Sequence, residues 1–176
     1  MKKNILFLML LLFCINLKIF AEEKPRVAFI ILEEDINEEP TTITETKLKS
    51  LFNSKGFNIV ESVFKEILPD EDLLDDEEKV KSLVKNLSAE IVVIGKVSVT
   101  EEESESYGLK SYLANISVTA FKTDNAEILG SFKNQATVYN EDAGAGSSDA
   151  LEKVSSEFAG EFVNQVLEKW TSKVSK

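Results

Sequence analysis

Residues 89–99, Ala-Glu-Ile-Val-Val-Ile-Gly-Lys-Val-Ser-Val, are predicted to form the third strand of the chain and to separate two kinds of connection. Before them, predicted strands and helices alternate, which is typical of a parallel sheet with right-handed crossovers. After them, strands follow one another through short turns, which favours an antiparallel meander. The sequence therefore predicts an α/β fold with α+β character, in two or three layers: a βαβαβ unit, an antiparallel β-meander and a long C-terminal helix.

Upstream of this strand, apolar runs alternate with amphipathic segments. The continuous apolar run within Arg26–Leu32 suits a strand covered on both faces, as in the middle of a parallel sheet. A helix is predicted over about Thr42–Lys55, where Thr41 or Thr42 can cap the start and Gly56 can end it. Phe57–Val60 forms a short second strand. Helical spacing then predicts a short helix or turn at 63–68 and a second helix through Val80, Leu83, Val84 and Leu87.

Downstream of residue 99, the apolar pattern changes to alternation. Residues 112–121 and 128–139 alternate nearly in period two, with a turn at Asp124–Glu127, and are predicted to be two further strands. Asn140–Ser148 contains Gly144-Ala145-Gly146 and is predicted to be a flexible loop. A final helix from about Ser148 to Trp170 keeps its apolar residues on one face, so we expect it to lie across the sheet.

The first 21 residues have the layout of a secretory signal peptide. Lys2 and Lys3 precede an apolar run at 5–15, and cleavage is expected after Ala21. The chain is therefore divided into a signal peptide at 1–21 and a single domain at 22–176, which is long enough to bury its own core. Cys14 is not expected to carry a lipid, because bulky Phe13 stands where a lipoprotein signal has a small residue. A periplasmic or secreted protein without membrane association is the expectation.

The mature chain lacks the side chains that carry most chemistry near neutral pH. There is no His in the sequence, and the only Cys is Cys14, inside the signal. These two residue types supply most nucleophiles, acid–base groups and transition-metal ligands. We therefore expect no enzyme, and we assign no catalytic, cofactor-binding or metal-binding residue and no cofactor.

The mature chain is strongly acidic. The signal contains three of the 20 basic residues and none of the 31 acidic ones, which leaves a net charge of about −14 after cleavage. Binding to nucleic acid and binding to anionic lipid headgroups both depend on Lys and Arg that neutralise phosphate, so neither a nucleic-acid partner nor an anionic lipid surface is expected. Such a charge keeps an exported protein dispersed, or it offers a docking face to a basic partner.

Four segments have residues that could form a ligand site, and for each the sequence favours a purely structural interpretation. Gly144–Ser148 could cradle a phosphate but lacks the glycine spacing and the Lys of nucleotide loops, so a flexible connection is favoured. Asp70–Glu78 has calcium-type ligands without the spacing of a calcium loop. The acidic residues of Glu33–Glu39 are expected to face solvent, and Glu101–Ser106 to form a charged hairpin tip. No carboxylate pair stands out as that of a glycosidase.

Residues 89–170 resemble a group of bacterial cell-envelope domains. The resemblance rests on Ala89–Gly95, on the alternating strand Leu113–Phe121, on the turn Asn125–Leu129, and on the Gly-Ser-rich loop with the long helix after it. The similar domains are the middle domain of flagellar assembly protein T, the TolB amino-terminal domain and the curli-secretion component G. The resemblance implies a small exported module that binds other envelope proteins and performs no catalysis.

The expected function is accordingly that of an adaptor. We expect an exported, non-catalytic assembly protein of the cell envelope that contacts envelope protein partners through sheet edges or acidic loops. The alternative is a periplasmic small-molecule binding protein with a pocket at the carboxyl ends of the parallel strands. A carboxylate-based hydrolase is a third alternative, and it requires an Asp or Glu of raised pKa in a cleft.

Overall fold

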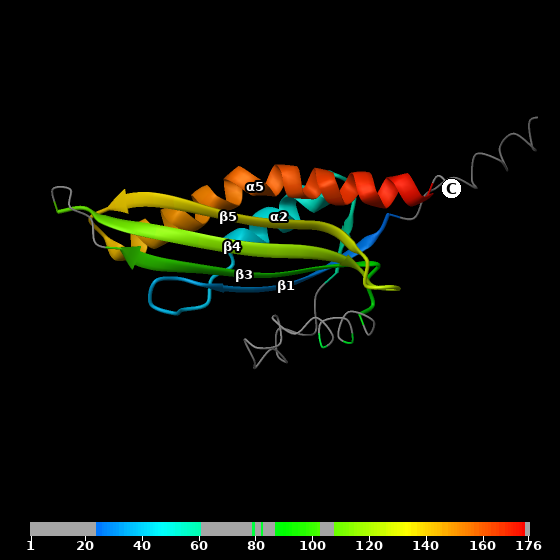
Figure 1. The fold of residues 1–176 in the computed structure, drawn as a ribbon, viewed down its shortest axis with the longest axis horizontal. Helices are drawn as coiled ribbons and strands as arrows, with labels where there is room; N and C mark the ends of the chain where they lie inside the picture. The colour runs from blue at the N-terminus through cyan, green and yellow to red at the C-terminus, as the bar shows by residue number, and fades with distance from the viewer. Residues whose placement is uncertain (1–23, 61–78, 80–81, 83–86, 103–107, 175–176) are drawn as a thin grey trace, which may run out of the picture.

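The computed structural model describes residues 24–60, 79, 82, 87–102 and 108–174. Within these residues, five strands and two helices follow one another along the chain (Figure 1). The elements are β1 (Arg26–Glu34), α2 (Ile43–Ser54), β2 (Asn58–Ile59), β3 (Ile91–Glu102), β4 (Lys110–Lys122), β5 (Ile128–Asn140) and α5 (Ala143–Val174). The signal peptide and the predicted helices at 63–68 and 80–87 lie outside the described residues, apart from Ser82 and Leu87.

All five strands belong to one mixed sheet, with the order β2-β1-β3-β4-β5. β1 pairs in parallel with β2 on one side and with β3 on the other, where Val27 is opposite Ile91. β3, β4 and β5 are antiparallel neighbours. The predicted α/β fold is therefore confirmed, and β3 is the strand at which parallel pairing gives way to antiparallel pairing.

One face of the sheet is covered by α2 and α5, which lie side by side (Figure 1). Alternate residues of the long strands point to this face, as period-two geometry requires; they are mostly buried on β1, β3 and β4, whereas Phe132 and Val138 of β5 are partly buried. Phe52 of α2 has edge-on ring contacts with Phe29, Phe57 and Phe162, at centroid distances of 5.4, 5.1 and 6.2 Å. The predicted position of the last helix across the sheet is confirmed.

The opposite face differs between the parallel and the antiparallel side of the sheet. Around β1 and β3 it is apolar and buried, and Val60 and Leu87 are among the described residues that pack there. Along β4 and β5 the same face is polar. It carries Leu113, Asn115, Ser117, Thr119, Ser131, Lys133, Gln135, Thr137 and Tyr139, all at least partly exposed. The continuous apolar run of β1 and the alternation of β4 and β5 follow from this difference.

The described helices include none that is long and apolar enough to cross a membrane.

Candidate functional site

The Gly144–Ser148 segment is not a loop, because α5 begins at Ala143. Asp142 caps the helix: its carboxylate accepts a hydrogen bond from the Ala145 N–H at 2.8 Å. Gly146 lies against the ring of Tyr112, and a Cβ at this position would be 2.2 Å from a ring carbon. The glycine therefore lets the helix approach the sheet, and the Asp142 carboxylate makes the helix start unsuited to a phosphate.

The acidic segment after β1 is only partly a solvent-facing loop. Glu33 is buried, with 2% of its surface exposed, and its carboxylate accepts hydrogen bonds from the Thr44 N–H at 2.9 Å and the Thr41 hydroxyl at 2.6 Å. It thereby caps the start of α2, a role that was predicted for Thr41 or Thr42. Asp35 orders the turn by accepting the N–H groups of Asn37 and Glu39, and the bond from Glu39 lowers the pKa of Asp35.

The other acidic segments contribute little to a described site. Asp70–Glu78 lies outside the described residues, as do positions 103–107 of the predicted hairpin tip. Glu101 and Glu102 extend β3, and Glu101 pairs with Lys110 at 2.9 Å, which raises the pKa of Lys110. Within the described ranges, no group of three or more acidic side chains is placed to hold a metal ion.

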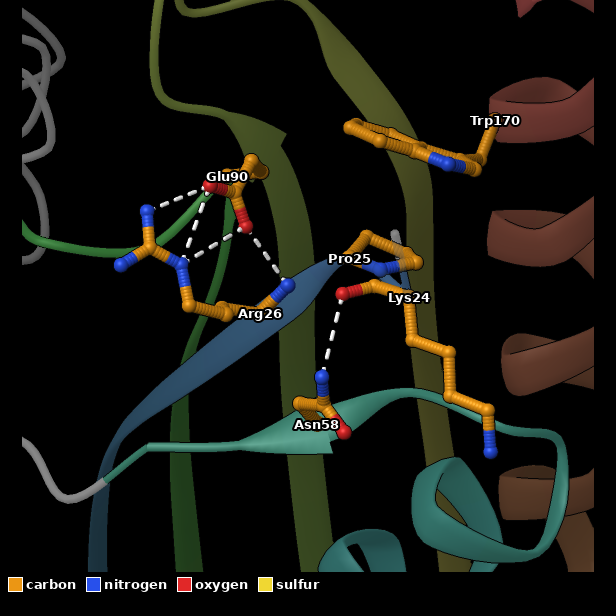
Figure 2. A pocket seen from close by; sticks show the side chains of 6 residues that line it. All are labelled: Lys24, Pro25, Arg26, Asn58, Glu90 and Trp170. Carbon is orange, nitrogen blue, oxygen red and sulfur yellow. Dashed lines mark hydrogen bonds and ion pairs between the residues drawn. The ribbon is translucent and has the colours of Figure 1, made fainter. Parts of the chain in front are cut away.

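Two hollows with apolar and charged walls lie at the opposite end of the sheet, around Trp170, and Figure 2 shows the first of them. One has a volume of about 370 Å³ and lies between Trp170, the start of β1 and Asn58. The second, of about 280 Å³, lies between Trp170, Lys55 and Phe57. Lys24, Pro25 and Trp170 line both hollows, so the two form one depression, which we call the Trp170 site.

The floor of the Trp170 site is fixed by hydrogen bonds between strand ends. Glu90 binds the Arg26 guanidinium at 2.5 Å and the Arg26 N–H at 2.6 Å (Figure 2). These bonds lower the pKa of the Glu90 carboxyl, mainly through the guanidinium of Arg26. Asn58 donates from its side chain to the Lys24 carbonyl at 3.3 Å. Because these groups are paired with one another, they position the site more than they offer charge to a ligand.

Two ammonium groups remain available at the rim of the site. Lys24 and Lys55 are exposed and have no ion-pair partner among the described residues. Lys122, by contrast, pairs with Asp124 at 2.8 Å, and its ammonium lies 5.9 Å from the centre of the Trp170 ring. The site thus offers an aromatic surface next to two free positive charges, which suits an anionic group attached to an apolar one.

The location of the Trp170 site differs from the predicted one. The alternative of a small-molecule binding protein predicted a pocket at the carboxyl ends of the parallel strands, whereas this site lies at the amino ends of β1 and β2. Sequence reasoning treated Trp170 as the last buried residue of a helix. The usable signal was that the only Trp of the chain lies in the last turns of the helix and directly follows Lys169.

A second candidate surface is the outer edge of β5. The Ser131 N–H donates a hydrogen bond to the side-chain oxygen of Gln165 at 3.3 Å, and the Thr137 carbonyl accepts a bond from the Lys153 ammonium at 2.9 Å. Both groups therefore point away from β4. By the alternation of an antiparallel ladder, the backbones of Lys133 and Gln135 point the same way. No described residue bonds to these two backbones, so the middle of the edge is open.

Comparisons with known proteins give a family and several distant folds. Residues 26–163 match the model of a family described as TP0693-like lipoprotein, C-terminal domain. Three similar solved structures are a hypothetical protein from Chlamydia trachomatis (14% identity, TM-score 0.45, covering 81% of this chain and 95% of that chain), a putative lipoprotein from Caulobacter crescentus (9%, 0.47, 84% and 91%), and a protein from Xanthomonas campestris (8%, 0.48, 87% and 89%). No curated protein matches the chain.

Proposed function

The chain belongs to the family of TP0693-like lipoprotein C-terminal domains, and from this premise we propose that it is an exported, non-catalytic adaptor of the cell envelope. The adaptor binds a protein partner by accepting one of its strands at the β5 edge. The open backbone of Lys133 and Gln135 in a strand of 13 residues carries this proposal. The resemblance of residues 89–170 to envelope assembly domains favours the same function and stays a prediction.

The β5 edge has the properties that strand addition requires. An added strand gains main-chain hydrogen bonds from the edge and specificity from the side chains that alternate along it. The side chains of Lys133, Gln135 and Tyr139 lie on the polar face of the sheet, next to this edge, and Tyr139 is 61% exposed. A tyrosine offers a large contact area at low conformational cost. The partner strand would pair with residues 133–135 and contact these side chains.

The edge is also protected at both sides of its open centre. Side chains of α5 reach over it: Lys169 binds the Ile128 carbonyl at 3.4 Å, Gln165 binds Ser131, and Lys153 binds Thr137. Charged side chains at an edge discourage indiscriminate pairing between sheets. These side chains of α5 therefore limit the part of β5 that can accept a partner strand to a few residues, which favours a specific partner over aggregation.

Proline substitutions test the edge without altering its charge. Gln135→Pro removes an outward N–H and is compatible with an edge strand, so the fold should be kept while partner capture is lost. Ala136→Pro is the matched control, because its N–H faces β4 and its loss should destabilise the sheet. A photo-crosslinking residue at Tyr139, in living cells, should trap a partner in the parent chain and at least tenfold less in Q135P. Equal crosslinking in Q135P would refute strand addition.

A small-molecule binding protein is the second candidate, favoured by the Trp170 site. The site combines an aromatic surface with the free ammonium groups of Lys24 and Lys55. A thermal-shift screen of lipids, sugars and nucleotides should then find a stabilising compound whose effect is lost in Trp170→Leu. A hydrolase gains no support from this site, because Glu90 is its carboxylate and the pKa of Glu90 is lowered, whereas a general acid needs a raised pKa.

The processing of the amino terminus is a finer part of the proposal. The sequence favours cleavage after Ala21, because Phe13 is bulky for a lipoprotein signal. The family is one of lipoproteins, which gives weight to the other route, a lipid on Cys14. Mass spectrometry of the mature protein decides between an amino terminus at Glu22 and a lipid-modified Cys14. Cys14→Ser changes the mature mass and membrane fractionation only on the second route.

A further inference from the structure

We propose that the Trp170 end of the domain docks on the anionic surface of a membrane, with Trp170 at the level of the lipid headgroups and Lys24 and Lys55 on their phosphates. This contact is separate from the adaptor function at the β5 edge. The β5 edge runs along the side of the domain, parallel to its long axis, so a protein partner and a membrane can be bound together (Figure 1).

The chemistry of the Trp170 end matches a lipid headgroup region. Trp170, Pro25 and Leu167 supply apolar surface, and Ile128 at the same end is 42% exposed. Tryptophan is enriched at membrane interfaces because its ring is apolar and its N–H needs a polar partner. Lysines next to such a surface can bind phosphate while their stems stay in the apolar layer. A small free anion would contact less of this apolar surface than a lipid headgroup region would, which favours the membrane.

The charge of the domain is distributed unevenly along its long axis. Among the described residues, the Trp170 end carries Lys24, Arg26, Lys55, Lys122 and Lys169 together with Glu90, Asp124, Glu127 and Glu168, so the described side chains there are close to balanced in charge. The described part of the opposite end carries the exposed or partly exposed acidic residues Glu34, Asp35, Glu38, Glu39, Glu101, Glu102, Glu141 and Asp142, against Lys110, which pairs with Glu101. An anionic surface repels the acidic end and orients the other end toward itself.

On the route that leaves a lipid on Cys14, the covalent structure also holds the Trp170 end near the membrane. The described part of the chain begins at Lys24, on the rim of the Trp170 site, and the segment that carries the export signal joins it there. From Cys14 to Lys24 is a reach of roughly 35 Å at full extension. A lipid on Cys14 would therefore hold this end, and not the acidic end, beside the bilayer.

The fluorescence of Trp170 provides a direct test, because it is the only tryptophan of the chain. The mature chain, as purified from cells, is added to vesicles of equal parts phosphatidylglycerol and phosphatidylcholine that carry brominated acyl chains. We expect a blue shift and quenching of Trp170 emission. The same change with inorganic phosphate and no vesicles, or equal quenching in pure phosphatidylcholine, would contradict the proposal and indicate a site for a free anion or an apolar molecule.

Charge reversal separates specific docking from general attraction. The double variant Lys24→Glu/Lys55→Glu should weaken quenching at least tenfold in lipid titration, since each lysine near an anionic surface contributes measurably to binding. Lys47→Glu/Lys110→Glu is the matched control, because it changes the charge by the same amount at two lysines that lie outside both the Trp170 site and the β5 edge. An equal loss in this control, or no loss in the Lys24/Lys55 variant, would overturn the proposal. The β5 crosslinking experiment should be unaffected by the Lys24/Lys55 variant, which keeps the two proposals distinguishable.

Discussion

The two ends of α5 lie at opposite ends of the sheet and are packed in opposite ways (Figure 1). At its beginning, Gly146 lies directly against the Tyr112 ring, and the nearby Glu33 is buried with its hydrogen bonds satisfied. At its end, Trp170 lines two adjoining hollows, next to Lys24 and Lys55, whose ammonium groups have no ion-pair partner among the described residues. The difference shows that one continuous helix can be tightly packed against the sheet at one end of a domain and leave surface hollows available for binding at the other end.

The largest effect is expected where the packing is tightest. Gly146→Ala places a methyl group 2.2 Å from a carbon of the Tyr112 ring, so the helix must move away from the sheet. We expect the free energy of unfolding to fall by about 3 kcal/mol. Gly160→Ala is the matched control in the same helix: it meets no atom within 4 Å and should gain about 1 kcal/mol through helix propensity. Urea unfolding measures both, and a neutral Gly146→Ala would show that the closed end is not tightly packed.

Glu33→Ala tests the same end through its hydrogen bonds. The change leaves the Thr44 N–H and the Thr41 hydroxyl without their acceptor, and we expect a loss of about 2 kcal/mol. Glu34→Ala, one residue further on and partly exposed, should change the stability by less than about 0.5 kcal/mol. Equal effects of the two variants in urea unfolding would mean that Glu33 does not cap α2.

Trp170→Leu examines the open end. It keeps apolar contact with the core but removes the ring that forms the surface of the Trp170 site, and we expect a loss of only about 1 kcal/mol. Thermal unfolding checks the value. If Trp170→Leu proved more costly than Gly146→Ala, the contrast between a closed and an open end would be wrong.

The smallest effect is expected for the pair between Arg26 and Glu90, whose side chains are 50% and 38% exposed. Since the pKa of Glu90 is lowered in the folded state from its ordinary value of 4.5, its stabilising contribution is complete above that value and is lost as the pH falls through the lowered pKa. Glu90→Gln should therefore cost about 0.5 kcal/mol at pH 7 and nothing in strong acid. A difference between variant and parent that grows toward low pH would contradict this.

The main elements could be predicted because their patterns are local. The apolar runs of β1 and β3, the alternation of β4 and β5 and the stripe of α5 each appear within one segment, and Gly56 ends α2 with a φ of +93° as expected. The predicted start of α5, at about Ser148, was wrong by five residues, because the helix begins at Ala143. Gly144-Ala145-Gly146 has the composition of a loop, but Gly146 is glycine because Tyr112, on another element, occupies the space of a side chain.

The sites were harder to predict because they join distant residues. Glu33 was expected to face solvent, and its burial depends on Thr44 eleven positions later. The Trp170 site brings together residues from the start of β1, the start of β2 and the end of α5, which no local pattern connects. The open centre of the β5 edge depends on which backbone groups the side chains of α5 reach, and strand periodicity alone does not reveal this.

The pairing of β1 with β3 has a consequence for the order in which the protein can fold. Of the described elements β1 is synthesised first, yet Val27 pairs with Ile91, and α5, which packs on β3, β4 and β5, is synthesised last. Long-range pairings of this kind form late, after nearby hairpins. β3, β4, β5 and α5 can assemble as a local unit, and β1 then docks against it. An unfinished chain would carry an exposed apolar strand until its last helix emerged, which calls for a holding chaperone on the route to its destination.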